Sequence, residues 1–163
     1  MKKIVSNILS AFFGILLGAF FIEIKKIESE RKMQDRCDKY LNYYTMLNLW
    51  VKEKNQGCLI SQYLIHNNYY NIAIYGMGEV GQRLCEELID SDINILYAID
   101  KNLEHSYLGI PVQSAQNCDP VDAIIVTATY DYEAIKKELE KSVSFPILSL
   151  NQIVFSMRNG GEI

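Results

Sequence analysis

The sequence has few of the residues that hold metal ions. It contains two histidines, His66 and His105, and four cysteines without a C-x-x-C pair. Zinc sites need closely spaced cysteine and histidine ligands, so no metal site is expected. Widely spaced cysteines are typical of reduced, mostly buried thiols in a reducing compartment. The four are Cys37, Cys58, Cys85 and Cys118.

The chain carries no net positive charge outside its first segment. Residues 1–36 hold seven Lys or Arg and four acids, a net charge of +3, and the rest hold nine basic and sixteen acidic residues, a net charge of −7. An acidic body repels phosphate backbones, so nucleic acid is not an expected partner. A length of 163 residues suits one domain. It is too short for a dinucleotide-binding domain with a separate substrate domain, which argues against most dehydrogenases.

No charged residue lies between Ile4 and Ile22. A helix over this stretch is about 28 Å long, close to the thickness of the hydrocarbon core of a bilayer. A cleaved signal peptide would need small residues at a cleavage site, and Phe20 and Phe21 stand there instead. The sequence therefore predicts a retained transmembrane anchor over residues 1–24.

Basic residues are more numerous after this segment than before it. Lys2 and Lys3 precede it, whereas five Lys or Arg follow within about fifteen residues. The positive-inside rule then predicts a single-pass protein of the cell membrane with its C-terminal body in the cytoplasm. Gly14 and Gly18 form a G-x-x-x-G on the same helix face as Ser10. This face of small residues either mediates homodimerisation in lipid or is a chance spacing.

A helical connector of two helices is expected over residues 25–69. No proline or glycine occurs from Glu23 to Lys54, and Asn55-Gln56-Gly57 then breaks the helix, with Gly57 as a left-handed cap. A second short helix is expected from Cys58 to His66. The first helix carries an amphipathic face that either packs on the following domain or docks a partner such as a second copy. That face comprises Cys37, Tyr40, Leu41, Tyr44, Leu47 and Val51.

From residue 70 to 158 strands and helices alternate. The apolar run Asn71–Tyr75 predicts a buried parallel strand that leads directly into a G-x-G-x-x-G sequence and a helix over Glu79–Ile89. The first glycine permits a tight turn, the second lets backbone approach a pyrophosphate, and the third lets the helix pack on the sheet. The free amides at the helix N-terminus attract phosphate. The motif is Gly76-Met77-Gly78-Glu79-Val80-Gly81.

A second strand, Ile93–Ile99, ends in an acid. Asp100 lies where a carboxylate accepts hydrogen bonds from a ribose diol, which favours NAD over NADP. Lys101 follows at once and either softens the rejection of a 2′-phosphate or is an exposed loop lysine. NAD is thus the first expectation for a cofactor, with NADP or a nucleotide sugar as alternatives.

The remaining pattern completes an α/β domain. A short edge strand is expected around Ile110–Val112, a strong strand over Asp122–Thr127, and further segments after Asp131, a good helix N-cap. Thr127, Ala128 and Thr129 lie at the carboxyl end of that strong strand, where an open sheet holds its ligand. The prediction is a Rossmann-like parallel sheet of four to five strands, in the order 3-2-1-4-5, with helices on both faces. The later segments are a helix over 132–141, a strand over 145–150, a helix over 151–157 and a flexible tail over 159–163.

Four pieces of sequence carry a family resemblance. Together they resemble the small nucleotide-binding domains of bacterial surface-polysaccharide biosynthesis proteins, including nucleotide-sugar dehydratases and sugar acetyltransferases. The same pieces look like redox-sensing repressor domains and regulatory domains of potassium transporters, which bind NAD(H) or adenine nucleotides. The chain departs from these in having no catalytic domain, acetyltransferase repeats or DNA-binding helices, and a single predicted membrane helix. The pieces are Asn71–Gly81, Tyr97–Lys101, Gly109–Val112 and Asp122–Ala128.

The resemblance implies a nucleotide or nucleotide-sugar ligand near Gly76, Gly78, Glu79, Val80 and Asp100. The expected function is a membrane-anchored binding module, accessory or sensory in surface-glycan assembly. A small epimerase- or dehydratase-like enzyme and a scaffold with a vestigial site are the alternatives.

One pair of residues matches a catalytic motif. Tyr132 and Lys136 form Y-x-x-x-K, the pair in which short-chain dehydrogenases use the tyrosine as acid or base. Those enzymes place the pair one strand–helix unit later and with a Ser or Thr ahead of it. We therefore assign no catalytic residue, and enzymatic activity is not the leading expectation.

Overall fold

The computed structural model describes residues 2–101, 106–116 and 118–157, without the side chains of residues 2–13, 15 and 16. The chain forms two compact units that meet between Leu41 and Asn42. The predicted C-terminal tail lies outside the described residues. The helices are α1 (Lys2–Asn55), α2 (Ile60–His66), α3 (Glu79–Leu88), α4 (Tyr132–Leu139), α5 (Leu150–Met157) and the 3₁₀ turn η1 (Thr129–Asp131). The strands are β1 (Asn71–Tyr75), β2 (Asn94–Ile99), β3 (Val112–Gln113), β4 (Ala123–Val126) and β5 (Ile147–Ser149).

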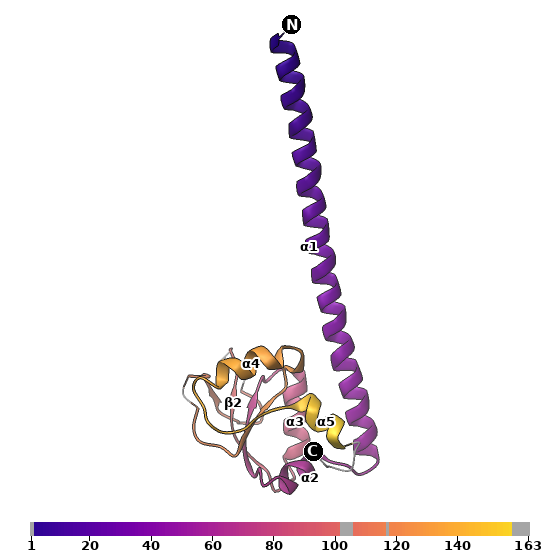
Figure 1. Cartoon of the computed structure of the whole chain (residues 1–163). Coiled ribbons are helices and arrows are strands. Elements are labelled where there is room, and N and C mark those ends of the chain that lie inside the picture. Colours follow the sequence, from indigo (N-terminus) through magenta and orange to yellow (C-terminus); the bar gives the residue numbers. More distant parts are fainter. Residues whose placement is uncertain (1, 102–105, 117, 158–163) are drawn as a thin grey trace. The chain divides into compact units, whose positions relative to one another are not determined.

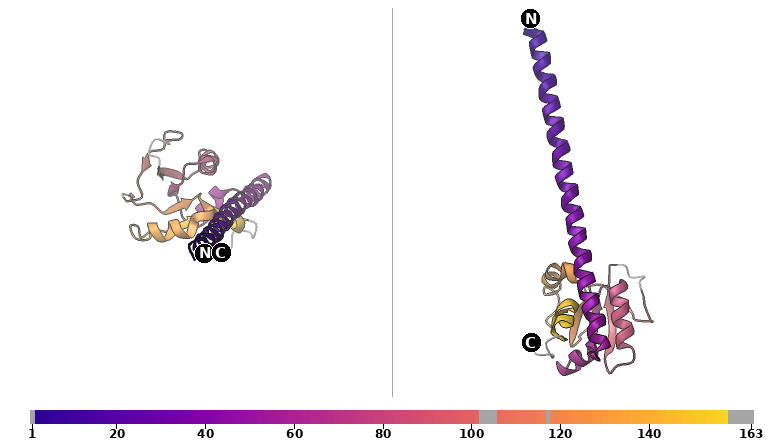
Figure 2. Two further views of the ribbon diagram at one scale, coloured as in Figure 1. Left: turned by 90° about the horizontal axis from the view of Figure 1, so that it is seen from above. Right: turned by 90° about the vertical axis from the view of Figure 1, so that its right-hand side faces the viewer.

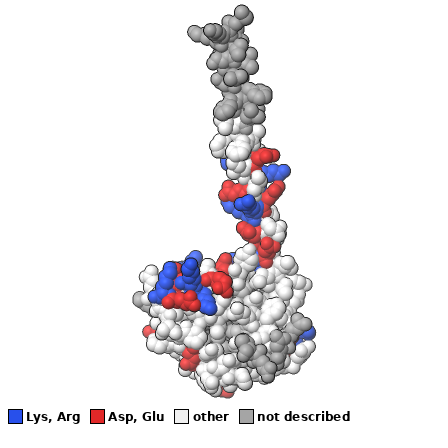
Figure 3. Space-filling view, viewed as in Figure 1, with Lys and Arg blue, Asp and Glu red and all other residues white. Residues whose placement is uncertain are grey.

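The first unit is the larger part of α1, a continuous helix in Figure 1. Ion pairs one turn apart support its polar part, Lys32 with Glu28 at 3.1 Å and Lys26 with Glu30 at 4.0 Å. Figure 3 shows basic and acidic side chains interspersed along this part of α1, and again on α4. Exposed pairs of this kind each contribute less than about 1 kcal/mol, so their main effect is to keep the helix surface solvated.

The apolar start of α1 is described only in part. Side chains of residues 2–13, 15 and 16 are outside the described set, so most of the predicted anchor is too. Within the described residues, no helix has the length and hydropathy to cross a bilayer. The described end of the segment exposes Leu17, Phe20, Phe21 and Ile22.

The second unit is built on a five-stranded parallel sheet. Its order is β3-β2-β1-β4-β5, as predicted, and every pair of neighbouring strands is parallel. β1 lies at the centre, in register with β4 from Ile72 opposite Ala123 to Tyr75 opposite Val126. One residue of β2, Leu96, bulges out of register between the pairs of Ile72 with Ile95 and Ala73 with Tyr97. The carboxyl ends of β1, β2 and β4 therefore share one edge of the sheet.

Alternate residues of the strands face two cores. We call the first core the side that joins the sheet to α1, α2, α3 and α5, and the second core the side that α4 covers. Ile72 and Ile74 of β1 lie in the first core, and Ala73 between them lies in the second. Figure 2 shows α3 and α4 on opposite sides of the strands. Helices on both faces were predicted, and the reason is that the central strands β1 and β4 bury residues on both faces.

Several predicted boundaries differ from the structure by one or two residues. β3 begins at Val112, because Pro111 has no N–H and contributes only its carbonyl, which accepts a hydrogen bond from the Ala98 amide at 2.8 Å. α2 begins at Ile60 rather than Cys58. Asp131 occupies the N-cap position of α4 but makes no capping hydrogen bond with its side chain, because η1 enters the helix first.

The amphipathic face predicted for α1 is mostly not the face that packs on the domain. In the second unit α1 buries Met46 and Trp50, whereas Tyr44 and Val51 are 65% and 58% exposed. Leu47 alone of the predicted set is partly buried against the first core. The buried stripe continues to Glu53, and a charged residue in that stripe hides it from a hydropathy pattern.

Candidate functional site

The glycine-rich loop joins β1 to α3 at the edge where the strands end. Gly76 has a φ of +94°, a conformation that glycine adopts readily, and its amide donates to the Ile99 carbonyl at 2.8 Å. The Thr127 hydroxyl lies 2.7 Å from the Gly76 carbonyl oxygen and 3.0 Å from that of Tyr75. The turn out of β1 is thus fixed from both neighbouring strands.

The other two glycines of the motif have different requirements. A Cβ at Gly81 would overlap the carbonyl oxygen of Gly76, so α3 can pack on the loop only with glycine there. A Cβ at Gly78 would meet no atom within 4 Å, and the φ of Gly78 is −68°. Neither packing nor backbone conformation within the protein requires glycine at position 78. The space beside it is open.

The N-terminus of α3 faces this open space. Gly78 is the N-cap and offers no side-chain capping bond, and the first intrahelical bond runs from the Gln82 amide to the Gly78 carbonyl at 3.0 Å. The amides of the first turn and the helix dipole make such a position favourable for an anion. Glu79, an exposed acid in the first turn, opposes that preference through its own negative charge.

The Asp100 carboxylate lies against the loop. Its Oδ2 accepts a hydrogen bond from the Met77 amide at 2.8 Å, so the end of β2 is tied to the turn after β1. Burial, and then the negative charge of Asp100, raise the pKa of the half-buried Tyr75. Lys101 is exposed. The structure thus brings Asp100 together with the glycine loop, and one oxygen of the carboxylate is used by the protein itself.

The residues after β4 are less accessible than the sequence suggested. Thr127 is 4% exposed and holds the loop. Thr129 is 8% exposed, and its hydroxyl donates to Oδ1 of Asn42 on α1 at 3.0 Å. Ala128 lies between them and is partly buried. Asn42 was not among the predicted site residues, because nothing local links it to a residue eighty-seven positions away.

Met77, also in the predicted set, faces the interior. It is buried in the first core, with the Cys85 Sγ at 3.8 Å from its Sδ. Burial raises the pKa of the Cys85 thiol to about 11. The Met77 side chain is therefore part of the core, and its backbone amide and carbonyl bond to Asp100 and Gln82.

Tyr132 and Lys136, the catalytic match, are also packed. The Tyr132 hydroxyl donates to the Ile147 carbonyl at 2.8 Å, and the Lys136 ammonium lies 5.9 Å from the ring centre of Tyr132. Burial raises the pKa of Tyr132, and the Lys136 charge lowers it to a smaller extent. The hydroxyl is used to join α4 to β5, so the proton that a catalytic tyrosine would exchange is engaged with a backbone carbonyl.

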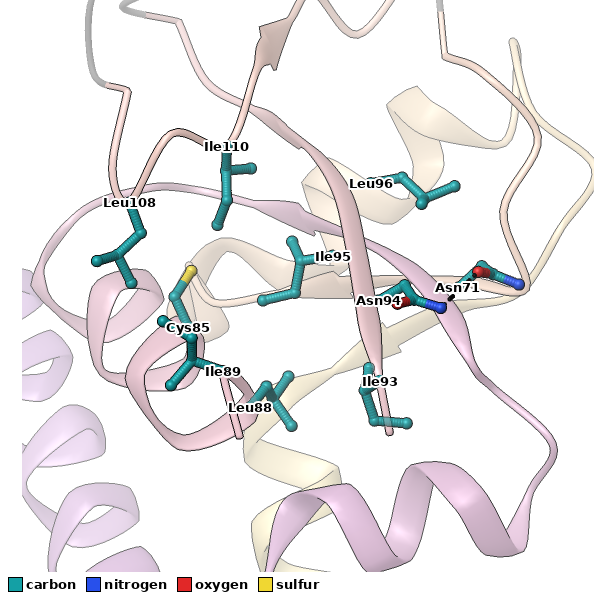
Figure 4. Close-up of a pocket in the computed structure, with 10 residues that line it drawn as sticks. All are labelled: Asn71, Cys85, Leu88, Ile89, Ile93, Asn94, Ile95, Leu96, Leu108 and Ile110. Carbon is teal, nitrogen blue, oxygen red and sulfur yellow. Dashed lines mark hydrogen bonds between the residues drawn. The ribbon is translucent and has the colours of Figure 1, made fainter. Parts of the chain in front are cut away.

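Two cavities lie along α3. One, of about 420 Å³, borders the first turn and is lined by Leu47 of α1 and by Glu79, Val80, Gln82 and Arg83 of α3. The other, of about 390 Å³, lies at the opposite end of α3 and is mainly apolar (Figure 4). Leu88, Ile95 and Leu108 contribute to it, and at its edge the side-chain amide Nδ2 of Asn94 donates to Oδ1 of Asn71 at 3.2 Å. The first cavity adjoins the glycine loop, and the second does not.

Across the part of the chain that the structure describes, no group of three or more His, Cys, Asp or Glu residues is placed to hold a metal ion.

Residues 68–146 match the family described as C2185-like, N-terminal. The match begins before β1 and ends before β5, so it covers the glycine loop, Asp100 and the end of β4 but neither α1 nor α5. No curated protein and no solved structure shows significant similarity to the chain.

Proposed function

We propose that this chain is a membrane-anchored protein whose second unit binds a nucleotide in the cytoplasm. The observation that carries the proposal is the open space beside Gly78 at the N-terminus of α3. NAD, NADP and nucleotide sugars are the candidate ligands. An accessory or sensory role in surface-glycan assembly rests on the resemblance of four sequence pieces alone.

Three features of the loop and of α3 support a diphosphate at this position. Gly76 and Gly81 are required by the fold of the loop, whereas Gly78 has no such role inside the protein. Exposed α3 amides and the helix dipole favour phosphate oxygens beside Gly78. The Asp100 carboxylate, 2.8 Å from the Met77 amide, is near enough to the loop to accept from a ribose attached to that diphosphate.

The test is nucleotide-dependent stabilisation of the full chain in detergent. At a hundredfold excess over its dissociation constant, a bound nucleotide raises the free energy of unfolding by about 2.7 kcal/mol. NAD⁺, NADH, NADP⁺ and uridine nucleotides form the panel. Gly78→Leu should remove the stabilisation, whereas Glu138→Gln, an exposed change on α4, should leave it unchanged. If no nucleotide shifts the melting temperature, the scaffold alternative replaces this proposal.

The proposed membrane anchoring rests on apolar side chains of α1 that are exposed. Leu17, Phe20, Phe21 and Ile22 are exposed on α1, and lipid is the solvent that would bury them. The full chain is then expected to resist extraction of membranes with alkaline carbonate. Phe20→Lys with Phe21→Lys should release it, and the matched change Met33→Lys, at another exposed apolar position of α1, should not.

The proposed orientation has a separate test. Cys37 is exposed just after the proposed membrane segment. In intact cells a membrane-impermeant maleimide should label Cys37 only after permeabilisation. Labelling of intact cells would contradict the cytoplasmic placement.

Self-association is a further part of the proposal. Gly14 and Gly18 leave open space on α1, with no atom within 4 Å of an added Cβ, as close helix pairing in lipid requires. The connector helix also has exposed apolar residues, among them Tyr44 and Val51. Crosslinking through Cys37 in membranes should yield a dimer of the unchanged chain. The yield should fall in Gly14→Leu if the dimer depends on the glycine face.

A further inference from the structure

We infer that the glycine-loop site takes a mononucleotide, a single nucleoside with its phosphates, rather than a dinucleotide. The inference rests on the proposed function. It follows from the contact between α1 and the end of β4, which closes one half of the ligand crevice.

A dinucleotide needs both halves of that crevice. In open parallel sheets it lies across the point where the strand order reverses, with one nucleoside on either side. Here that point lies between β1 and β4, because the chain proceeds from β1 to β2 on one side and to β4 on the other. The first nucleoside would lie toward Asp100 at the end of β2. The second would have to lie over Thr127–Thr129 at the end of β4.

At the β4 half, the protein covers Thr127 and Thr129, and Ala128 between them is partly buried. The hydroxyl of Thr127 contacts the loop carbonyls, and that of Thr129 donates to Asn42 of α1. Both threonines are less than a tenth exposed. One helical turn after Asn42, Met46 is completely buried in the first core, so this part of α1 is held in place by packing as well as by the hydrogen bond.

Among the residues that the structure describes, none covers Gly78 at the start of α3 or hides Lys101 after β2. No atom lies within 4 Å of a Cβ at Gly78, and Lys101 after Asp100 is exposed. The 420 Å³ cavity beside the first turn of α3 is bounded by Leu47 of the same α1 helix. Its polar lining, Glu79, Gln82 and Arg83, suits a small hydroxyl-bearing group carried on the terminal phosphate. A nucleoside diphosphate, free or joined to such a group, fits these surroundings.

The test is calorimetric titration of the full chain in detergent with ADP, UDP and NAD⁺ at one salt concentration. We expect ADP or UDP to bind at least about tenfold more tightly than NAD⁺, a difference of about 1.4 kcal/mol. Asn42→Ala should lower the dissociation constant for NAD⁺ and so reduce the ratio of that constant to the one for ADP or UDP. The affinity for ADP or UDP should change less than about twofold. Asn48→Ala, an exposed asparagine on the same helix, is the matched control.

A second variant keeps the test valid if Asn42→Ala does not fold. Thr129→Val removes the same hydrogen bond with little change in volume, and it should narrow the ratio in the same direction. NAD⁺ binding in the unchanged chain as tightly as ADP or UDP would overturn the mononucleotide inference and leave nucleotide binding intact. Binding of none of the three at any concentration would overturn the proposed function itself, so the two failures are distinct.

Discussion

The carboxylate of Glu87 accepts a hydrogen bond from the indole nitrogen of Trp50 at 2.8 Å. The Ile60 amide donates to its other oxygen at 2.9 Å, and the Lys54 ammonium lies 3.2 Å away. The Glu87 side chain is 2% exposed. One buried carboxylate on α3 therefore joins the last turns of α1 to the first turn of α2, and so connects the connector helices to the sheet domain.

Removing this carboxylate should destabilise the second unit. Glu87→Ala leaves the Trp50 indole, the Ile60 amide and the Lys54 charge without their acceptor, and we expect a loss of about 2–4 kcal/mol in the free energy of unfolding. Urea denaturation followed by Trp50 fluorescence measures it. Glu138→Ala, which breaks only the exposed pair with Lys141, should change stability by less than about 0.5 kcal/mol. Equal effects of the two changes would contradict the role of Glu87.

The same substitution at two glycines of the loop should destabilise the fold to different extents. Gly81→Ala places a methyl group against the Gly76 carbonyl, and we expect a loss of at least about 2 kcal/mol. Gly78→Ala meets open space, so its cost should stay within about 1 kcal/mol, the scale of an N-cap change. Nucleotide affinity should fall in Gly78→Ala despite the intact fold. Unchanged nucleotide affinity in Gly78→Ala would contradict the proposal that a phosphate binds beside residue 78.

Cys85 should be the slowest of the cysteines to alkylate. Burial raises the pKa of its thiol to about 11, so at pH 8 only about one thiol in a thousand is the reactive thiolate. Its rate should rise about tenfold per pH unit up to about pH 11. Mass spectrometry after iodoacetamide treatment should find Cys37, which is exposed, modified first. Labelling of Cys85 as fast as Cys37 at pH 8 would show that the first core opens readily.

The same pKa shift has a consequence for stability. Because the folded state holds the Cys85 proton more tightly than the unfolded chain does, this stabilisation is complete below about pH 9 and is lost as the pH rises through about 11. Cys85→Ala should flatten that part of the pH dependence, as measured by urea denaturation between pH 8 and pH 11.

Tyr132 should matter for stability and not for nucleotide binding. Tyr132→Phe removes the hydrogen bond to the Ile147 carbonyl, which should cost about 0.5–1.5 kcal/mol. The affinity for any bound nucleotide should be unchanged. If the chain converted a nucleotide sugar to product and Tyr132→Phe abolished that turnover, the hydroxyl would have the catalytic role that its hydrogen bond argues against.

Local signals in the sequence predicted the sheet well. Asn71–Tyr75 is the observed β1, and the observed strand order, β3-β2-β1-β4-β5, is the predicted one. Gly57 and Gly76 both have positive φ, as expected of glycines that end a helix and open a loop. These features depend on residues within a few positions of one another, and that is why a pattern in the sequence shows them.

Contacts between distant segments were not predictable in this way. Glu86 and Glu87 are adjacent acids on one helix, yet Glu87 alone is buried, because Trp50 and Ile60 provide donors only in the folded unit. Asn42 resembles any polar residue of a connector helix until α1 packs and brings it to Thr129. Thr127 and Thr129, predicted to lie at the ligand crevice, also form hydrogen bonds to segments far away in the sequence.

The first core has a consequence for the order in which the protein can be completed. It contains Met46 and Trp50 of α1 together with Ile153 and Val154 of α5, and α5 follows all five strands in the chain. A ribosome therefore releases Met46 and Trp50 long before the last residues of this core exist. During that interval two large apolar side chains lie uncovered, a surface of the kind that chaperones bind. Final closure of this core takes place only after α5 has been translated.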